Sequence, residues 1–210
     1  MSDIKIGRMV VGIYATNCYF LYRADSKEVV VVDVPDEGRM IANKLAQYGF
    51  KVVGILLTHG HFDHIWGVSE LRSASSAKVY AYTKEEPIMQ SARLNVSERM
   101  RRPVTLKVNK YLEDGDEIEL AGIKFKMLAT PGHTRGSCCY YVEEAGMLVS
   151  GDTLFLESVG RNDFPTGSAT DMKRSIREKL FVLPDDTKVY PGHGDETTIG
   201  HEKQYNPFLV

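Results

Sequence analysis

The sequence predicts an α/β sandwich in which two groups of β-strands pack face to face and are covered by helices. Short runs rich in β-branched and aromatic residues recur along the chain, and stretches with helical spacing of apolar residues lie between them. At 210 residues, with 43% hydrophobic and 26% charged residues, the chain suits one sizeable core. We therefore expect residues 1–210 to form a single domain.

The first half of the chain is expected to hold five strands and two helices. Helical spacing is clearest at residues 36–48, where Met40, Ile41 and Leu45 share one face, and a second helix is expected at residues 64–73. The strands are predicted from their β-branched and aromatic content at residues 10–14, 18–22, 28–33, 52–58 and 78–82.

The second half begins, after a polar middle segment, with a predicted hairpin. Its turn signals are the glycines at 115 and 122, and in residues 123–127 apolar side chains alternate with lysines, which indicates a half-buried strand. Further strands are expected at residues 138–142, 147–150 and 188–190, with a helix at residues 171–180.

A dense group of histidines and carboxylates directly follows the apolar run at residues 52–57. Within six residues the chain places His59, His61, Asp63 and His64. Imidazole and carboxylate groups suit a divalent metal such as Zn, Fe or Mn. Without a metal, so many ionisable groups at the end of a buried strand would be costly to desolvate. The segment therefore predicts a metal site.

Three more candidate ligands, His133, Asp152 and His193, occur downstream in a similar setting. Each follows a short strand-like run and is directly preceded by a glycine, which lets the backbone turn tightly and approach a ligand closely. Five of the six histidines fall in these motifs. The sixth, His201, follows a glycine but no strand-like run, so we expect it at the surface or beside the site rather than as a ligand.

Charge and cysteine content narrow the class of protein. The net charge is −2 with no basic block, so no nucleic-acid partner is expected, and no apolar run reaches the ~20 residues that span a bilayer. The N-terminus lacks the apolar stretch of a secretory signal, so the chain is expected to be cytoplasmic. Three cysteines, Cys18, Cys138 and Cys139, favour core packing over a disulfide framework.

On these motifs the chain resembles the metallo-β-lactamase superfamily, whose His-x-His-x-Asp-His signature is followed by a later His, Asp and His. The resemblance runs from about Asn17 to Pro207. It implies a four-layer αββα sandwich of two mixed sheets and a pair of divalent metal ions, with Zn expected first and Fe or Mn as alternatives. The implied ligands are His59, His61 and His133 for the first metal, Asp63, His64 and His193 for the second, and Asp152 as the bridge.

The resemblance implies a hydrolase. Two metals about 3.5–4 Å apart lower the pKa of bound water toward ~7, which supplies a hydroxide to attack an acyl carbonyl at neutral pH. Asp63 could orient that water or accept its proton, and Asp33 could fix the tautomer of a ligand histidine. The chain contains no Gly-x-Ser-x-Gly nucleophile motif.

Within the superfamily the chain most resembles the short, single-domain branch of glyoxalase II, the hydroxyacylglutathione hydrolases. In longer relatives a C-terminal helical domain contacts glutathione, whereas only residues 194–210 follow His193 here, which leaves glutathione recognition open. The motifs that carry this likeness are Thr130-Pro131-Gly132-His133-Thr134, Gly151-Asp152-Thr153-Leu154-Phe155, Ser158-Val159-Gly160-Arg161 and Asn206-Pro207-Phe208-Leu209.

Each candidate substrate contact in the sequence also has a purely structural explanation. Arg135, where relatives often have proline, either lies on the surface or points a cation into the cleft. Arg161 lies where similar enzymes place a basic residue that meets an anionic substrate, but Asp163 offers it a structural salt bridge. Residues 85–110 carry six basic residues and form either a solvated helix face or a basic rim for a carboxylate-bearing thioester.

Three functional classes stay open from the sequence. The first is a binuclear thioesterase acting on S-2-hydroxyacylglutathione or a related small thioester, with a hydrolase of another small ester or lactone as its near variant. The second is a persulfide dioxygenase, a similar branch that uses one iron and shares a Gly-Arg-x-Asp-Phe run. The third is a non-enzymatic metal-binding module, which a complete ligand set disfavours. The β-lactamases, usually exported, and the RNA-processing branches fit less well.

Overall fold

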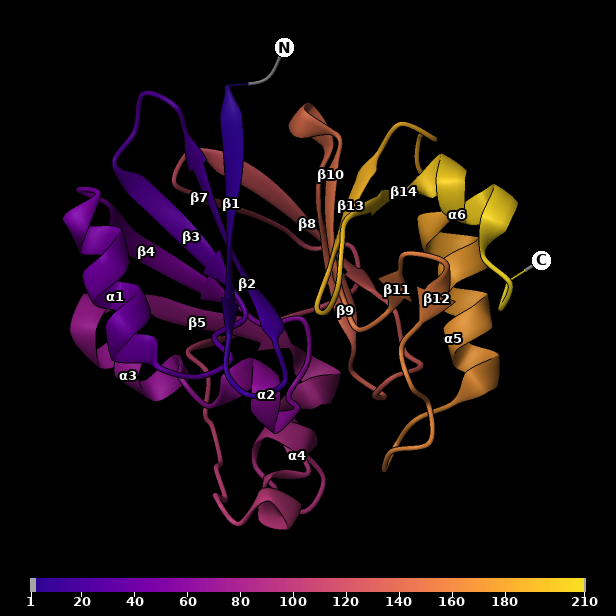
Figure 1. Cartoon of the computed structure of the whole chain (residues 1–210), viewed down its shortest axis with the longest axis horizontal. Helices are drawn as coiled ribbons and strands as arrows, with labels where there is room; N and C mark the ends of the chain where they lie inside the picture. The colour runs from indigo at the N-terminus through magenta and orange to yellow at the C-terminus, as the bar shows by residue number, and fades with distance from the viewer. Residues whose placement is uncertain (1–2, 210) are drawn as a thin grey trace.

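Two six-stranded sheets form the centre of the computed structural model, which describes residues 3–209 (Figure 1). The first sheet comes from the N-terminal half in the order β1-β2-β3-β4-β5-β6. It is mixed, because β1 to β3 pair antiparallel whereas β3 to β6 run parallel. Its strands are β1 (Ile4–Val11), β2 (Thr16–Arg23), β3 (Glu28–Val32), β4 (Lys51–Leu56), β5 (Lys78–Tyr82) and β6 (Lys110–Leu112).

The second sheet comes from the C-terminal half in the order β14-β13-β10-β9-β8-β7. Only β10 and β13 pair parallel in it. Its strands are β7 (Glu117–Leu120), β8 (Ile123–Ala129), β9 (Cys138–Val142), β10 (Met147–Gly151), β13 (Lys188–Pro191) and β14 (Thr197–Thr198). A small hairpin of β11 (Leu154–Phe155) and β12 (Ser158–Val159) follows β10.

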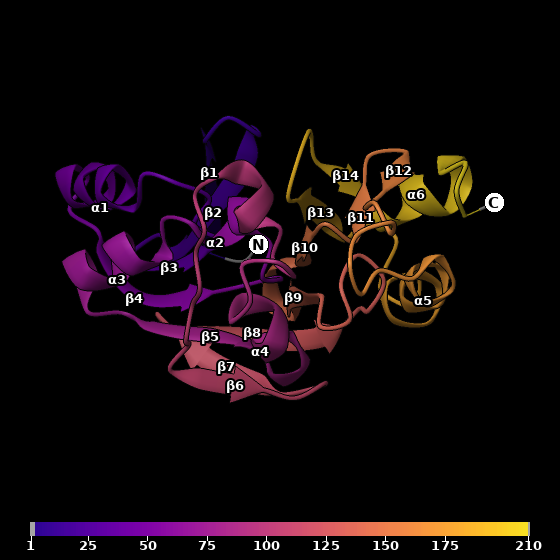
Figure 2. The same ribbon diagram turned by 90° about the horizontal axis from the view of Figure 1, so that it is seen from below.

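Helices cover the outer face of each sheet, which confirms the four-layer αββα sandwich (Figure 2). The first sheet packs against α1 (Gly38–Gln47) and α3 (Val68–Ser75). The second packs against α5 (Ala169–Ser175), which a π-helical turn over Ile176–Leu180 continues, and α6 (Ile199–Tyr205). Two short helices, α2 (Phe62–Ile65) and α4 (Glu86–Met89), lie in loops at one end of the sandwich.

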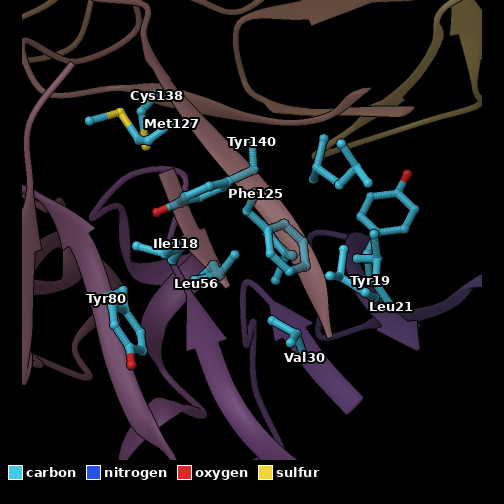
Figure 3. Close-up of a cluster of buried hydrophobic side chains, with 14 of the residues drawn as sticks. Tyr19, Leu21, Val30, Leu56, Tyr80, Ile118, Phe125, Met127, Cys138 and Tyr140 are labelled. Atoms are coloured by element: carbon cyan, nitrogen blue, oxygen red, sulfur yellow. The ribbon is translucent and has the colours of Figure 1, made fainter. Parts of the chain in front are cut away.

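The main core lies between the two sheets and joins the halves of the chain (Figure 3). Leu56 and Val30 reach it from the first sheet, and Phe125 and Tyr140 reach it from the second. In β8 the apolar residues are buried while the two lysines between them are exposed, so this strand is half-buried as predicted. By contrast all four valines of β3 are buried, because helices and the second sheet cover its two faces.

Several predicted boundaries were wrong for local reasons. The strand expected at residues 10–14 ends at Val11, because Gly12 adopts φ +75° and opens a turn to β2. The helix expected at residues 64–73 is two helices, α2 and α3, which break near Gly67, where the backbone passes close to Gly38. The short elements β6, β11, β12, β14 and α6 were not predicted.

The three cysteines are buried and free, as the core-packing interpretation expected. Burial raises the pKa of the Cys139 thiol to about 11, so it stays protonated at neutral pH. Within residues 3–209, no helix has both the length and the apolar character needed to cross a membrane.

Phe125→Ala tests the shared core. Phe125 is fully buried between the sheets, so we expect the free energy of unfolding to fall by about 3–5 kcal/mol. Tyr48→Ala is the control, since Tyr48 is 65% exposed and its loss should cost no more than about 0.5 kcal/mol. Urea denaturation of the metal-free proteins measures both, and similar losses for the two variants would contradict a core that depends on Phe125.

Candidate metal centre

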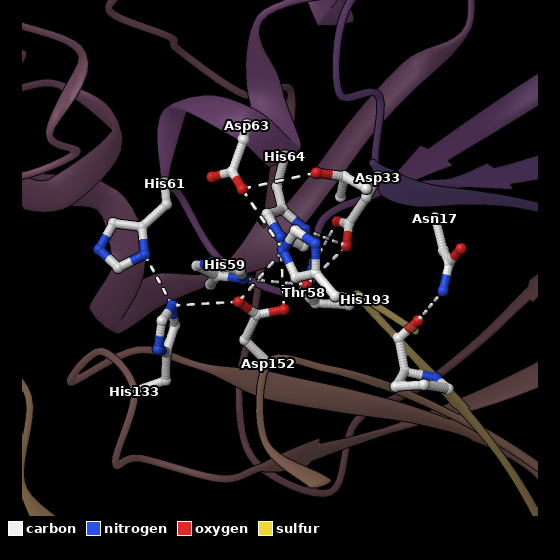
Figure 4. A network of polar contacts seen from close by, with 12 residues as sticks. Asn17, Asp33, Thr58, His59, His61, Asp63, His64, His133, Asp152 and His193 are labelled. Atoms are coloured by element: carbon white, nitrogen blue, oxygen red, sulfur yellow. Dashed lines mark hydrogen bonds and ion pairs between the residues drawn. The ribbon is translucent and has the colours of Figure 1, made fainter. Parts of the chain in front are cut away.

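All seven predicted ligands lie at one end of the sandwich, on loops that leave the ends of strands (Figure 4). His59 and His61 follow β4, and Asp63 and His64 lie in α2 just beyond them. From the second sheet, one ligand each follows β8, β10 and β13. Their donor atoms fall into three groups within 4.8 Å: His59, His61 and His133; His59, His64 and Asp152; and Asp63, His64 and His193.

Asp152 lies between the groups. Its Oδ2 is 3.5 Å from Nε2 of His133 and 3.6 Å from Nε2 of His193, and its Oδ1 is 3.4 Å from Nε2 of His64. In Figure 4 His61 and His133 stand on one side of Asp152 and His193 stands on the other. One carboxylate thus reaches both halves of the cluster, as the expected bridge requires.

A buried carboxylate, Asp33, fixes two of the imidazoles. Its Oδ2 accepts a hydrogen bond from Nδ1 of His64 at 2.8 Å and another from the Thr58 hydroxyl at 2.7 Å. The Thr58 oxygen in turn lies 3.2 Å from Nδ1 of His59. Because each Nδ1 donates outward, the Nε2 atoms of both histidines face the cluster and are the atoms that a metal would meet. The contact expected between Asp33 and a candidate ligand is therefore present.

His133 is oriented by main chain from another loop. Its Nδ1 donates to the carbonyl oxygen of Arg161 at 2.6 Å, which leaves Nε2 free on the cluster side. That Nε2 lies 2.7 Å from Nδ1 of His61, so two imidazole nitrogens converge on one point.

Several buried polar atoms at the centre of the cluster lack a well-formed hydrogen bond, although charged neighbours lie within 4 Å. They include Nε2 of His59, Nε2 of His64 and Oδ1 of Asp152. A buried group that lacks a hydrogen bond costs free energy, and an unexplained one calls for an unseen water or ion. The residues present therefore fit a divalent metal site, with nitrogen and oxygen donors of the kind Zn, Fe and Mn accept.

Burial keeps three of the histidines neutral. It lowers the pKa of His59 well below its usual value, lowers that of His61 to about 3, and lowers that of His133 as well. Neutral imidazoles have a free lone pair, so these side chains need not lose a proton to bind a metal at neutral pH.

In the other four candidate ligands, charged neighbours outweigh the effect of burial on the pKa. Burial opposes ionisation of Asp152, but the nearby His64 outweighs it and holds the Asp152 pKa well below its usual range. Burial likewise opposes protonation of His64, yet Asp152 and Asp33 raise its pKa well above the usual value. Asp63 has a lowered pKa despite burial because His193 donates to it, and the pKa of His193 is raised in return.

Two glycines let the loops approach as closely as they do. A Cβ on Gly192 would lie 2.2 Å from Oδ1 of Asp152, and a Cβ on Gly151 would lie 2.4 Å from the Thr58 hydroxyl. Gly151 also adopts φ +49°, a left-handed conformation that favours glycine. The glycines that precede the ligands are thus required by the close contacts they permit.

Glu85 ties the two main ligand loops together and was not predicted from the sequence. Its Oε1 accepts from the Gly60 N–H at 2.7 Å, and its Oε2 accepts from the Thr134 hydroxyl at 2.8 Å. The Gly136 N–H donates to the same carboxyl, and burial raises the Glu85 pKa to about 7. In the sequence Glu85 precedes another glutamate, so the pair resembles an ordinary exposed turn.

The two arginines predicted to contact substrate, Arg135 and Arg161, line different cavities in the structure. Arg161 lines the cavity above the cluster, but its guanidinium also forms a two-point salt bridge with Asp163 at 2.8 and 2.9 Å. Arg135 is exposed and lines a different cavity, beside Arg174 and Lys179. The structure therefore does not bring Arg135 to the cluster.

The basic segment at residues 85–110 approaches the cluster through an apolar residue, Val96, which lines the cavity. Arg102 instead forms an ion pair with Asp36 at 2.7 Å, and its guanidinium lies over the Trp66 ring. His201 lies in α6 and pairs with Glu157, outside the cluster, as expected.

Sequence comparisons agree with the geometry. A family model described as the metallo-beta-lactamase superfamily matches residues 11–193. The chain is 39% identical over 208 residues to the probable metallo-hydrolase YqgX of Bacillus subtilis (strain 168), covering 98% of both proteins. It is 30% identical over 199 residues to the hydroxyacylglutathione hydrolase GloC of Haemophilus influenzae, covering 93% of both.

Solved structures give the same fold at high similarity. The BLEG-1 B3 metallo-beta-lactamase superposes with a TM-score of 0.94 at 37% identity, covering 98% of this chain and 100% of that one. TTHA1623 in a di-iron-bound form gives 0.85 at 33% identity, with 97% and 100% covered. ETHE1 from Myxococcus xanthus gives 0.77 at 28% identity, with 97% and 83% covered.

Metal content tests the ligand assignment. We expect about two divalent ions per chain in the wild type and at most one in Asp152→Asn, because Asp152 reaches both halves of the cluster. His201→Asn is the matched control, since His201 lies outside the cluster, and it should keep the full content. Elemental analysis after dialysis measures all three proteins. An unchanged content in Asp152→Asn would contradict the bridging role.

Glu85→Gln tests the tie between the ligand loops. A glutamine has one acceptor oxygen in place of two, so at least one of the three donors loses its partner. We expect a loss of about 1–3 kcal/mol in stability and about 10–100-fold weaker metal binding. Competition with a chromophoric chelator measures the affinity.

Glu86→Gln is the control for this variant, because the Glu86 carboxylate accepts hydrogen bonds from Gln90 and Tyr111, neither of which lies in a ligand loop. A Glu85→Gln protein that is less stable but binds metal as tightly as the wild type would limit Glu85 to a role in the fold.

Proposed function

Because this chain belongs to the metallo-β-lactamase superfamily, we propose that it is a binuclear metal-dependent hydrolase of small thioesters, with S-2-hydroxyacylglutathiones as the first candidates. The observation that carries the proposal is the position of Asp152, whose oxygens reach His64 and His193 on one side and His133 on the other. The thioester part is supported by the likeness to the hydroxyacylglutathione hydrolase GloC across nearly the whole chain.

In the proposed reaction the chain's own residues hold and orient the centre. His59, His61 and His133 would hold one ion, Asp63, His64 and His193 the other, and Asp152 both. Divalent ions bound there lower the pKa of coordinated water toward ~7 and polarise a carbonyl oxygen.

Asp63 is the candidate proton acceptor. It lies half-buried at the cavity and its lowered pKa keeps it ionised at neutral pH, because His193 donates to it. The Thr16 hydroxyl, 3.5 Å away, limits how its carboxylate can rotate. An ionised carboxylate held in this way can orient an attacking water and accept its proton. The proposed partner is a small molecule, in keeping with the chain's small net charge.

A mononuclear-iron persulfide dioxygenase is the second candidate. The likeness to ETHE1 favours it, as does the Gly160 to Phe164 run, whose Arg161 carbonyl orients His133. In this reading two histidines and one aspartate would hold a single iron. The likeness to BLEG-1 adds β-lactams to the substrates worth testing.

One set of assays on the same metal-analysed sample separates these candidates. We expect hydrolysis of S-lactoylglutathione with about two metals per chain, and a fall in kcat of about 10²–10⁴-fold in Asp63→Asn molecules that retain metal. Oxygen uptake with glutathione persulfide at one iron per chain would overturn the proposal in favour of the dioxygenase. Hydrolysis of a chromogenic β-lactam alone would replace the thioester with a lactam.

A further inference from the structure

We infer that, among small thioesters, the site prefers a short apolar acyl group, alkyl or aryl, over the hydroxylated acyl group of the first candidates named above, so that a hydroxyacyl thioester is hydrolysed but less efficiently. The inference rests on the proposed thioester hydrolysis and concerns the cavity above the metal cluster, of about 320 Å³. Ligand pockets range from about 300 to 1,000 Å³, so this one suits a small group. Its floor is formed by the candidate ligands, and its walls are Tyr14, Phe62, Val96, Phe155, Phe164 and Arg161.

Aromatic rings flank the cluster at both ends. The Phe164 ring lies edge-on to His61 and His133, with ring centroids 5.0 and 5.8 Å away. The Phe155 ring lies edge-on to His193 at 6.3 Å, in the other half of the cluster. A carbonyl held between the halves therefore has a phenyl ring on either side. An aromatic surface is thus available to the acyl group in either half of the cavity.

Two polar side chains, Arg161 and Tyr14, stand among the wall residues, and both are partly engaged. Arg161 is the only arginine or lysine among the described residues that line this cavity, and its Nε and Nη2 donate to Asp163 while the guanidinium stacks over Phe164 at 4.4 Å. The Tyr14 hydroxyl donates to the sulfur of Met100 at 2.8 Å. The other wall residues, Phe62, Val96, Phe155 and Phe164, have apolar side chains. A hydroxyl or carboxylate of the acyl group that packs against them would lose its water without gaining a partner, which is unfavourable.

The backbone conformation of Val96 is an independent observation that supports an apolar wall. Its φ of +67° is left-handed, a conformation that β-branched residues rarely adopt, yet its side chain is buried against the cavity. Strained backbone of this kind costs about 1–3 kcal/mol and clusters at ligand clamps. The loop holds an apolar side chain at this position although glycine or asparagine would fit the backbone at lower cost.

The matched substrates that test this inference are 2-methylpropanoyl and 2-hydroxypropanoyl thioesters of glutathione, which differ only by a methyl group in place of a hydroxyl. We expect kcat/KM, divided by each compound's rate of alkaline hydrolysis, to be about 10-fold higher or more for the methyl compound. If neither thioester is hydrolysed, the proposed function fails. If both are hydrolysed and the hydroxyl compound is equal or better, only the inference is overturned.

Binding of uncleavable analogues gives a readout that needs no turnover. S-(2-methylpropyl)glutathione should bind the metal-loaded protein about 10-fold more tightly than S-(2-hydroxypropyl)glutathione, measured by calorimetry. Equal dissociation constants would count against an apolar acyl site even if hydrolysis is observed.

Variants of Phe164 test whether this ring causes the preference for the methyl compound over the hydroxyl compound. Phe164→Ala should remove most of the methyl-over-hydroxyl preference, whereas Phe164→Leu, which keeps an apolar side chain, should retain most of it. Tyr48→Ala, a distant exposed position, is the control and should behave as the wild type. Metal content is checked in each protein. A Phe164→Ala protein with normal metal content and an unchanged preference would overturn the role of this ring.

Discussion

Seven imidazole and carboxylate groups, four of them buried histidines, gather at the end of an apolar sandwich, and this is the constraint on which the rest of the structure depends. Such groups are costly to remove from water unless each has a partner. Asp33, Thr58 and the Arg161 carbonyl satisfy the outward-facing nitrogens of three histidines. The inward-facing atoms converge on one another, and several of them lack a well-formed hydrogen bond, which is the arrangement a metal ion would complete.

The two sheets supply the rigidity that this convergence needs. Ligands from β4 and α2 meet ligands from β8, β10 and β13 only because the interlayer core, centred on residues such as Phe125 and Tyr140, holds the sheets in fixed register. Glu85 adds a local tie, since one carboxyl group bonds both the loop of His61 and the loop of His133. The two sheets and Glu85 therefore hold the candidate ligands in more precise positions than the loops alone would.

The fold is shared with relatives of different named activities, so the walls above the cluster carry the information on substrate. Here those walls are mostly aromatic, and the one cation among the described lining residues, Arg161, is paired with Asp163. In the proposed reaction, metal and hydroxide chemistry would be available to any acyl compound that fits, and the fit would depend on Phe155, Phe164 and Val96.

The sequence by itself determined the fold class and predicted a candidate ligand set, because periodicity marks buried strands and helices, and because dense His and Asp motifs after strands have few other physical explanations. Only the tertiary structure decided what surrounds those ligands. In the sequence Glu85 looks like a surface residue, but in the structure two loops bond to it. Arg135 and Arg161 are both plausible substrate contacts in the sequence, but in the structure Arg135 lines a different cavity from Arg161. Contacts between residues far apart in the chain leave no periodic signal in a single sequence.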